Sequence, residues 1–86
     1  MKSRRSKQFR KLYDELPQSV QEQALAAYRL FRANPFHPSL HFKQIRQDAP
    51  VYSTRVGKGY RAVGIWKGDM IVWTWIGSHA DYDKLY

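Results

Sequence analysis

The chain has 86 residues and no cysteine, and its 15 Lys and Arg residues against 7 Asp and Glu give a formal net charge of +8. This length supports one domain with one hydrophobic core, spanning residues 1–86, and excludes a multidomain enzyme. The lack of thiols excludes disulfides and thiolate metal sites, so we expect a reducing cytoplasm as the compartment. No apolar run approaches the roughly 20 residues that span a bilayer. The charge favours a polyanionic or acidic partner, with nucleic acid as the first candidate.

Two amphipathic helices are predicted in the first part of the chain. Apolar residues recur at i, i+3, i+4 and i+7 over about residues 6–15, which predicts a short helix that Pro17 ends. The same spacing from Val20 to Phe31 predicts a second helix. Its start has two interpretations, Pro17 at the first helical position or a Ser19–Glu22 capping box, and Pro35 fixes its end. Two helices joined by so short a turn form an antiparallel hairpin.

Strand signals follow the two-proline turn at residues 34–39. Residues 42–45 are expected to form a short strand or an irregular edge, and three longer strands follow at Val51–Val56, Tyr60–Lys67 and Met70–Ser78. Glycines in the two intervening turns supply the positive φ that tight hairpins need. The ending HADYDKLY predicts a final helical turn with Ser78 as N-cap. The predicted fold is α+β: a helix hairpin on a three- to four-stranded antiparallel sheet, with a short C-terminal helix.

The last strand carries bulky apolar residues on both faces. Strict alternation points Ile71, Trp73 and Trp75 one way and Val72, Thr74 and Ile76 the other. One face is expected to cover the helix hairpin. The opposite face is either a surface for a partner, or it is covered by the N-terminal arm or the C-terminal helix.

The sequence has no phosphate-binding glycine loop, metal signature or nucleophile elbow, so we expect no cofactor and no metal. For His37 and His41 we expect structural or surface roles. His79 differs, because it follows the last strand at the edge of the sheet and a histidine can exchange a proton at neutral pH. Metal-free RNA cleavage needs such a group and cations around the phosphate. The available cations are Lys43, Arg55, Lys58 and Arg61, and Tyr82 lies one helical turn after His79. The alternative to a cleavage site is a surface that is basic and has no catalytic role.

Three segments, NPFHPSL, VYSTRVGKGYRAVGI and IVWTWIGSHADYDKL, resemble the RelE/ParE superfamily of toxins over most of the chain. The resemblance implies that Arg61, in the Tyr60-Arg61 step, contacts the scissile phosphate. The ending IGSHADYDKL resembles the YafQ-like branch, which implies that His79 works in proton transfer, with Tyr82 and Tyr86 as further contributors. Members of the family begin with an apolar strand, whereas residues 1–6 here are polar and basic, so the sheet is expected to lack that edge strand.

The resemblance implies a toxin that cleaves messenger RNA on the ribosome and so inhibits translation. In this interpretation His79, Arg61 and Tyr82 are catalytic, and Lys43, Arg55 and Lys58 bind the RNA backbone. An acidic antitoxin would bind the toxin in a hetero-oligomer. The alternatives are a ParE-like protein that poisons DNA gyrase without chemistry of its own, and an inactive member that only binds its antitoxin.

Overall fold

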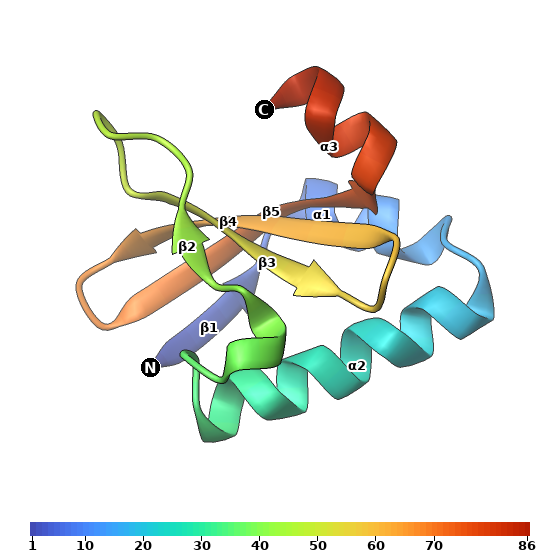
Figure 1. Cartoon of the computed structure of the whole chain (residues 1–86), viewed down its shortest axis with the longest axis horizontal. Helices are drawn as coiled ribbons and strands as arrows, with labels where there is room; N and C mark the ends of the chain where they lie inside the picture. The colour runs from blue at the N-terminus through green and yellow to red at the C-terminus, as the bar shows by residue number, and fades with distance from the viewer.

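A computed structural model describes all 86 residues as a five-stranded sheet with helices on both faces (Figure 1). The elements in chain order are β1 (Lys2–Arg5), α1 (Lys7–Asp14), α2 (Gln18–Ala33), the 3-10 helix η1 (Pro38–Leu40), β2 (Lys43–Gln44), β3 (Val51–Val56), β4 (Tyr60–Lys67), β5 (Met70–Ser78) and α3 (His79–Leu85). We call the face that packs on α1 and α2 the inner face and the face under α3 the outer face. None of the helices combines the length and the apolar character that crossing a membrane requires.

The predicted helix hairpin is present, with one correction at the start of α2. Helix α1 begins after Ser6, whose hydroxyl accepts a hydrogen bond from the Phe9 N–H at 3.1 Å. At the start of α2 the Pro17 carbonyl accepts from the N–H groups of Val20 and Gln21. Pro17 is therefore the N-cap, one residue before the predicted first helical position, and Ser19 is already inside the first turn, so the capping box is wrong.

The sheet has one strand more than predicted, and it is mixed rather than antiparallel. Its order is β1-β5-β4-β3-β2, and β1 lies parallel to β5 with Lys2 opposite Met70 and Arg5 opposite Trp73. The expectation that residues 1–6 form no edge strand is therefore wrong. An edge strand that is exposed to solvent on both faces needs no alternation of apolar and polar residues. The polar sequence KSRR therefore carries no signal from which a strand can be predicted. The meander β3, β4 and β5 has the predicted bounds and pairing.

A bulge in β5 changes which side chains face the helices. Val63 lies opposite Trp75 and Gly64 opposite Trp73, so Thr74 is an extra residue in the β4–β5 ladder. Beyond it the alternation is inverted: Ile76 joins the inner core with Trp73, and Trp75 packs on the outer face against α3. The predicted strict alternation is wrong after Trp73.

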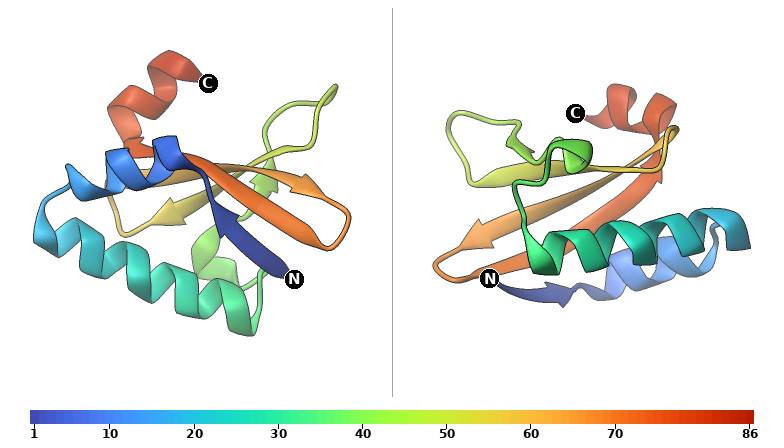
Figure 2. Two further views of the ribbon diagram at one scale, coloured as in Figure 1. Left: turned by 180° about the vertical axis from the view of Figure 1, so that it is seen from behind. Right: turned by 60° about the horizontal axis from the view of Figure 1, so that its bottom comes forward.

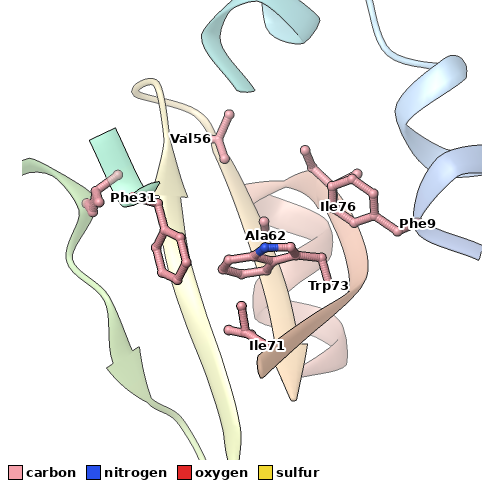
Figure 3. Packing of buried hydrophobic residues seen from close by; sticks show 8 residues of the cluster. Phe9, Phe31, Val56, Ala62, Ile71, Trp73 and Ile76 are labelled. Carbon is pink, nitrogen blue, oxygen red and sulfur yellow. The ribbon is translucent and has the colours of Figure 1, made fainter. Parts of the chain in front are cut away.

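The hydrophobic core fills the inner face (Figure 3). Phe9 from α1 and Phe31 from α2 pack onto Ile71, Trp73 and Ile76 of β5, and the rings of Phe31 and Trp73 meet edge to face at 5.3 Å. Each fully buried side chain of this size stabilises the fold by about 1.5–3 kcal/mol. This packing stabilises the sheet that carries the residues of the outer face.

Candidate functional site

The start of α3 is fixed to the turn between β3 and β4. Ser78 caps the helix by accepting a hydrogen bond from the Asp81 N–H at 3.1 Å. The N–H of His79 donates to the Gly59 carbonyl at 2.8 Å. These bonds hold the backbone of His79 beside the Gly57–Gly59 turn, at the end of β5.

The imidazole of His79 is open to solvent on one side and supported on the other. Its Nε2 lies 3.4 Å from Asp83 Oδ2, and 51% of the His79 side chain is exposed. Its ring stacks on that of Tyr82 with centroids 6.1 Å apart. A group placed in this way can exchange protons with a bound substrate. Asp83 was missed by sequence reasoning, although its i, i+4 spacing from His79 is a signal that points to it.

Arg61 belongs to a cross-strand row that leads towards His79. Its Cα is paired with Arg55 in β3 and with Gly77 in β5, two residues before His79. Side chains directly opposite in a ladder share a face, so this row lies on the outer face. Gly77 leaves room for the Trp75 indole, because a Cβ there would be 2.6 Å from Trp75 Cζ2. The structure thus brings Arg61 and His79 to the same end of the outer face.

The other predicted cations are spread more widely. Arg55 donates from Nε to the Gly57 carbonyl at 3.0 Å and lines a groove of about 300 Å³ together with Gln23 and Ser39, so its guanidinium turns towards the open edge of β3. Lys58 is exposed in the turn that holds His79. Lys43 is exposed on β2, on the far side of β3 from Arg61. Lys58 is therefore close to the candidate site and Lys43 is not.

Two tyrosines of α3 cover the middle of the outer face. The Tyr82 hydroxyl donates to Ser53 Oγ at 3.3 Å, and the rings of Tyr82 and Tyr86 lie 6.4 and 5.7 Å from that of Trp75. Burial raises the pKa of Tyr86, the charge of Arg46 opposes this, and Tyr82 adds to it. Of the two predicted ways to cover the tryptophan-bearing face, the C-terminal helix is the one observed. Arg46 is in a loop, and no sequence pattern points to it.

The other two histidines have local roles in the turn around η1. His37 Nδ1 accepts a hydrogen bond from the Ser39 N–H at 3.2 Å and caps η1. His41 is exposed and adopts a left-handed conformation with φ of 48° after η1. Three or more His, Asp or Glu side chains do not come together anywhere as they would around a metal ion.

A second concave surface lies on the inner side, between α2 and the β1–α1 segment. It is a groove of about 460 Å³ with mainly apolar walls, including the partly exposed Leu25 and Tyr28 of α2. Arg4, Arg5 and Arg10 also line it. None of these arginines is paired with a carboxylate, since the two ion pairs of the molecule involve Lys2 and His79.

Comparison with known proteins agrees with this fold and with the resemblance in the sequence. The family model of the ParE-like toxin domain matches residues 18–84. Among solved structures, a RelB-RelE antitoxin-toxin complex from Methanococcus jannaschii is similar, with 21% identity, a TM-score of 0.76, and coverage of 96% of this chain and 99% of that chain. A YoeB/ParE toxin from Agrobacterium tumefaciens has 18% identity, a TM-score of 0.73, and coverage of 92% and 99%. An archaeal RelE-RelB complex from Pyrococcus horikoshii OT3 has 20% identity, a TM-score of 0.65, and coverage of 90% and 92%.

No curated protein matches the sequence. The family match spans most of the chain, so the chain belongs to the RelE/ParE superfamily of toxins, in the ParE-like toxin domain family. The solved structures show that the three helices and the mixed five-stranded sheet are the fold of RelE-like toxins.

Proposed function

We propose that this toxin cleaves messenger RNA without a metal, using His79 for proton transfer and Arg61 to bind the scissile phosphate. The observation that supports it most is the shared position of these two side chains at one end of the outer face, where the His79 backbone is bonded to Gly59 and Arg61 lies opposite Gly77. One residue supplies a titratable proton and the other a fixed positive charge. Phosphodiester cleavage by an internal nucleophile needs both, together with a second group for the other proton transfer.

The reaction is a transesterification in which the RNA supplies its own nucleophile. The 2′-oxygen loses its proton and bonds to phosphorus, and the bond from phosphorus to the 5′-oxygen breaks. The products are a 2′,3′-cyclic phosphate and a 5′-hydroxyl. The 2′-hydroxyl gives its proton to one group, and the leaving 5′-oxygen takes a proton from another: His79 makes one of these transfers, and Tyr82 or a water molecule makes the other. Arg61 stabilises the charged phosphorane, and the Tyr82 ring is also placed to stack on a base. Lys58 binds the RNA backbone near the scissile phosphate, and Arg55 and Lys43 bind the RNA backbone farther from it.

We further propose that the messenger RNA is cleaved while it is held on the ribosome, and that an acidic antitoxin is the partner that silences the toxin. Two of the similar structures are complexes of RelE with RelB. The inner groove supplies apolar contacts through Leu25 and Tyr28 and unpaired arginines beside them, which complements an acidic amphipathic segment. Leu25→Glu should weaken antitoxin binding in co-purification, and Ala26→Glu, a matched change on exposed α2, should not.

The second candidate function is a ParE-like toxin that binds DNA gyrase and performs no chemistry. The match of the ParE-like toxin domain to residues 18–84 is the observation that favours it. The two functions differ in what induced expression does to a cell. Cleavage predicts loss of intact messenger RNA with undamaged DNA, whereas gyrase poisoning predicts a DNA damage response with intact messenger RNA. Growth without any defect would indicate a member that only binds its antitoxin.

A further inference from the structure

The positive charge of the chain is concentrated at its N-terminal end. Six of the 15 Lys and Arg residues lie within the first 11 positions, and the first acidic residue is Asp14. The six are Lys2, Arg4 and Arg5 of β1 and Lys7, Arg10 and Lys11 of α1, which we call the basic edge. All six are exposed, and Lys2 alone has a carboxylate partner, Asp69 at 3.7 Å.

Local structure arranges these cations in two adjoining rows. Along β1, Lys2 and Arg4 are two residues apart and point the same way, about 6.6 Å from one another along the strand. Along α1, Lys7, Arg10 and Lys11 share one face at i, i+3 and i+4, opposite the buried Phe9. Figure 2 shows β1 running directly into α1 at the margin of the sheet. The first turn of α1 holds no acidic residue, so the positive end of its dipole adds to the field.

Neither folding nor the proposed active site accounts for this arrangement. Charges on an edge strand prevent unwanted strand pairing, but this reason does not apply to the exposed face of α1. Lys2 pairs with Met70, at the other end of β5 from His79, and α1 packs on the inner face of the sheet, whereas the candidate site is on the outer face. Residues 1–17 also lie outside the segment that the family model matches.

The chemistry of the basic edge indicates a nucleic-acid backbone as its ligand. A DNA duplex presents one phosphate charge per about 1.7 Å of its axis, and any duplex carries its phosphates on two strands, which suits cations spread over both a strand and a helix. The six cations include no aromatic residue, and the rings of α1 are covered, since Phe9 is 7% exposed and Tyr13 is half-buried. The exposed Tyr28 of α2 is a single ring beside β1, whereas surfaces that bind unpaired strands stack successive bases on several rings. The basic edge also offers no exposed apolar wedge for a membrane, because the apolar side of α1 is packed in the core.

We propose that the basic edge binds the phosphate backbone of double-helical nucleic acid, with duplex RNA as the probe, independently of base sequence. This surface is separate from the residues of the proposed cleavage reaction and does not depend on that reaction. Arg4, Arg5 and Arg10 also line the inner groove. An acidic segment seated there would compete with RNA for the same cations, so binding of one would weaken binding of the other.

The test measures binding of the full chain to a 16-base-pair RNA duplex by fluorescence anisotropy over a series of KCl concentrations. Every protein carries His79→Ala so that cleavage cannot intervene. The triple variant Lys7→Gln/Arg10→Gln/Lys11→Gln is compared with Arg29→Gln/Arg32→Gln/Lys67→Gln, which removes the same charge elsewhere. Glutamine preserves helix propensity, and circular dichroism verifies folding. Lys2→Gln/Arg4→Gln tests the same edge without changing α1.

We expect the α1 triple variant to bind duplex RNA at least about tenfold more weakly, with a salt dependence shallower by about two to three phosphate contacts. The control should lose less than about threefold. Equal losses in both triple variants would overturn the proposal, as would binding to phosphatidylserine vesicles but not to duplex RNA, or tighter binding to single-stranded poly(U). A DNA duplex of the same length should lose affinity in the same variants, because the ligand is the phosphate backbone. An undiminished affinity of the α1 triple variant for both duplexes would also overturn the proposal. If the proposed cleavage reaction were wrong, the difference in affinity between the two triple variants would still be expected, because every protein in this test carries His79→Ala.

Discussion

Arg61 lies directly opposite Gly77 in the β4–β5 ladder, and His79 follows Gly77 by two residues. Strand pairing thus sets the position of the Arg61 backbone relative to the start of α3, where the imidazole is attached. Backbone hydrogen bonds therefore set the positions on β4 and α3 from which the Arg61 and His79 side chains extend. Such preorganisation is what stabilises a charged transition state effectively.

Replacing Arg61 should lower the rate of RNA cleavage far more than it lowers stability. Arg61→Ala removes the charge proposed to face the phosphorane, and losses of about 10²–10³ in rate are typical of such a group. Because Arg61 has no carboxylate partner, unfolding should change by no more than about 1 kcal/mol. Single-turnover cleavage and urea denaturation measure the two effects. Arg29→Ala, on the exposed side of α2, is the control, and equal rates in both variants would exclude the role of Arg61.

The hydrogen bond between Tyr82 and Ser53 should contribute measurably to the attachment of α3. Ser53 is 1% exposed, so Tyr82→Phe leaves a buried hydroxyl without this partner and should cost about 0.5–1.5 kcal/mol. Tyr28→Phe removes a comparable bond to Ser3 that is exposed, and should cost less than about 0.5 kcal/mol. Thermal unfolding measures both. A double-mutant cycle of Tyr82→Phe with Ser53→Ala that showed no coupling would contradict this account.

Gly77 should tolerate no side chain, whereas Gly59 should. A Cβ on Gly77 would approach Trp75 Cζ2 to 2.6 Å, and the indole that must move also supports Tyr82 and Tyr86. Gly77→Ala should therefore destabilise the fold by about 1–3 kcal/mol. Gly59→Ala meets no atom within 4 Å and serves as the matched control. The opposite order of the two unfolding free energies would show that Trp75 does not pack over Gly77.

Stability should fall at alkaline pH in a way that depends on Tyr86. Burial raises the pKa of Tyr86 above its ordinary value of 10.0, so the folded state holds this proton more tightly than the unfolded chain does. The contribution is fully present below pH 10 and is lost as the pH rises through the folded pKa. Denaturant unfolding between pH 8 and 11.5 should show a smaller alkaline loss for Tyr86→Phe than for the wild type. Parallel curves would mean that Tyr86 is not desolvated.

The sequence predicts the strands of the meander well because their signals are local. Gly57 and Gly68 mark turns of positive φ, and the apolar runs between turns have a clear length. Strand β1 escaped detection because its pairing with β5 is a long-range contact made by polar residues. The face of the sheet predicted for Trp75 was wrong because of the bulge at Thr74. Such a bulge depends on the partner strand, where the register shifts between Val63 and Gly64.

The sequence indicates His79, Arg61 and Tyr82 as residues of the candidate site, but it does not indicate how these residues are arranged in space. Motif position indicated His79 and Arg61, and the ladder between β4 and β5 then placed them at one end of the sheet. Arg55 was expected in the same group, yet its bond to the Gly57 carbonyl turns it to the edge of β3. Lys43 was expected to bind the RNA backbone, and the structure places it on β2, which β3 separates from Arg61 on β4. Both outcomes depend on strand order, which residue types do not specify.

The proposed chemistry depends most directly on His79, and one measurement tests it. Messenger RNA 5′ ends are mapped after induced expression of the wild type, of His79→Ala, and of His41→Asn as a control histidine that keeps a residue tolerant of positive φ. The wild type and His41→Asn should produce new 5′ ends bearing hydroxyl groups within coding regions, and His79→Ala should abolish them while remaining folded. The same ends in the His79→Ala sample, at the same abundance, would contradict a catalytic role for His79.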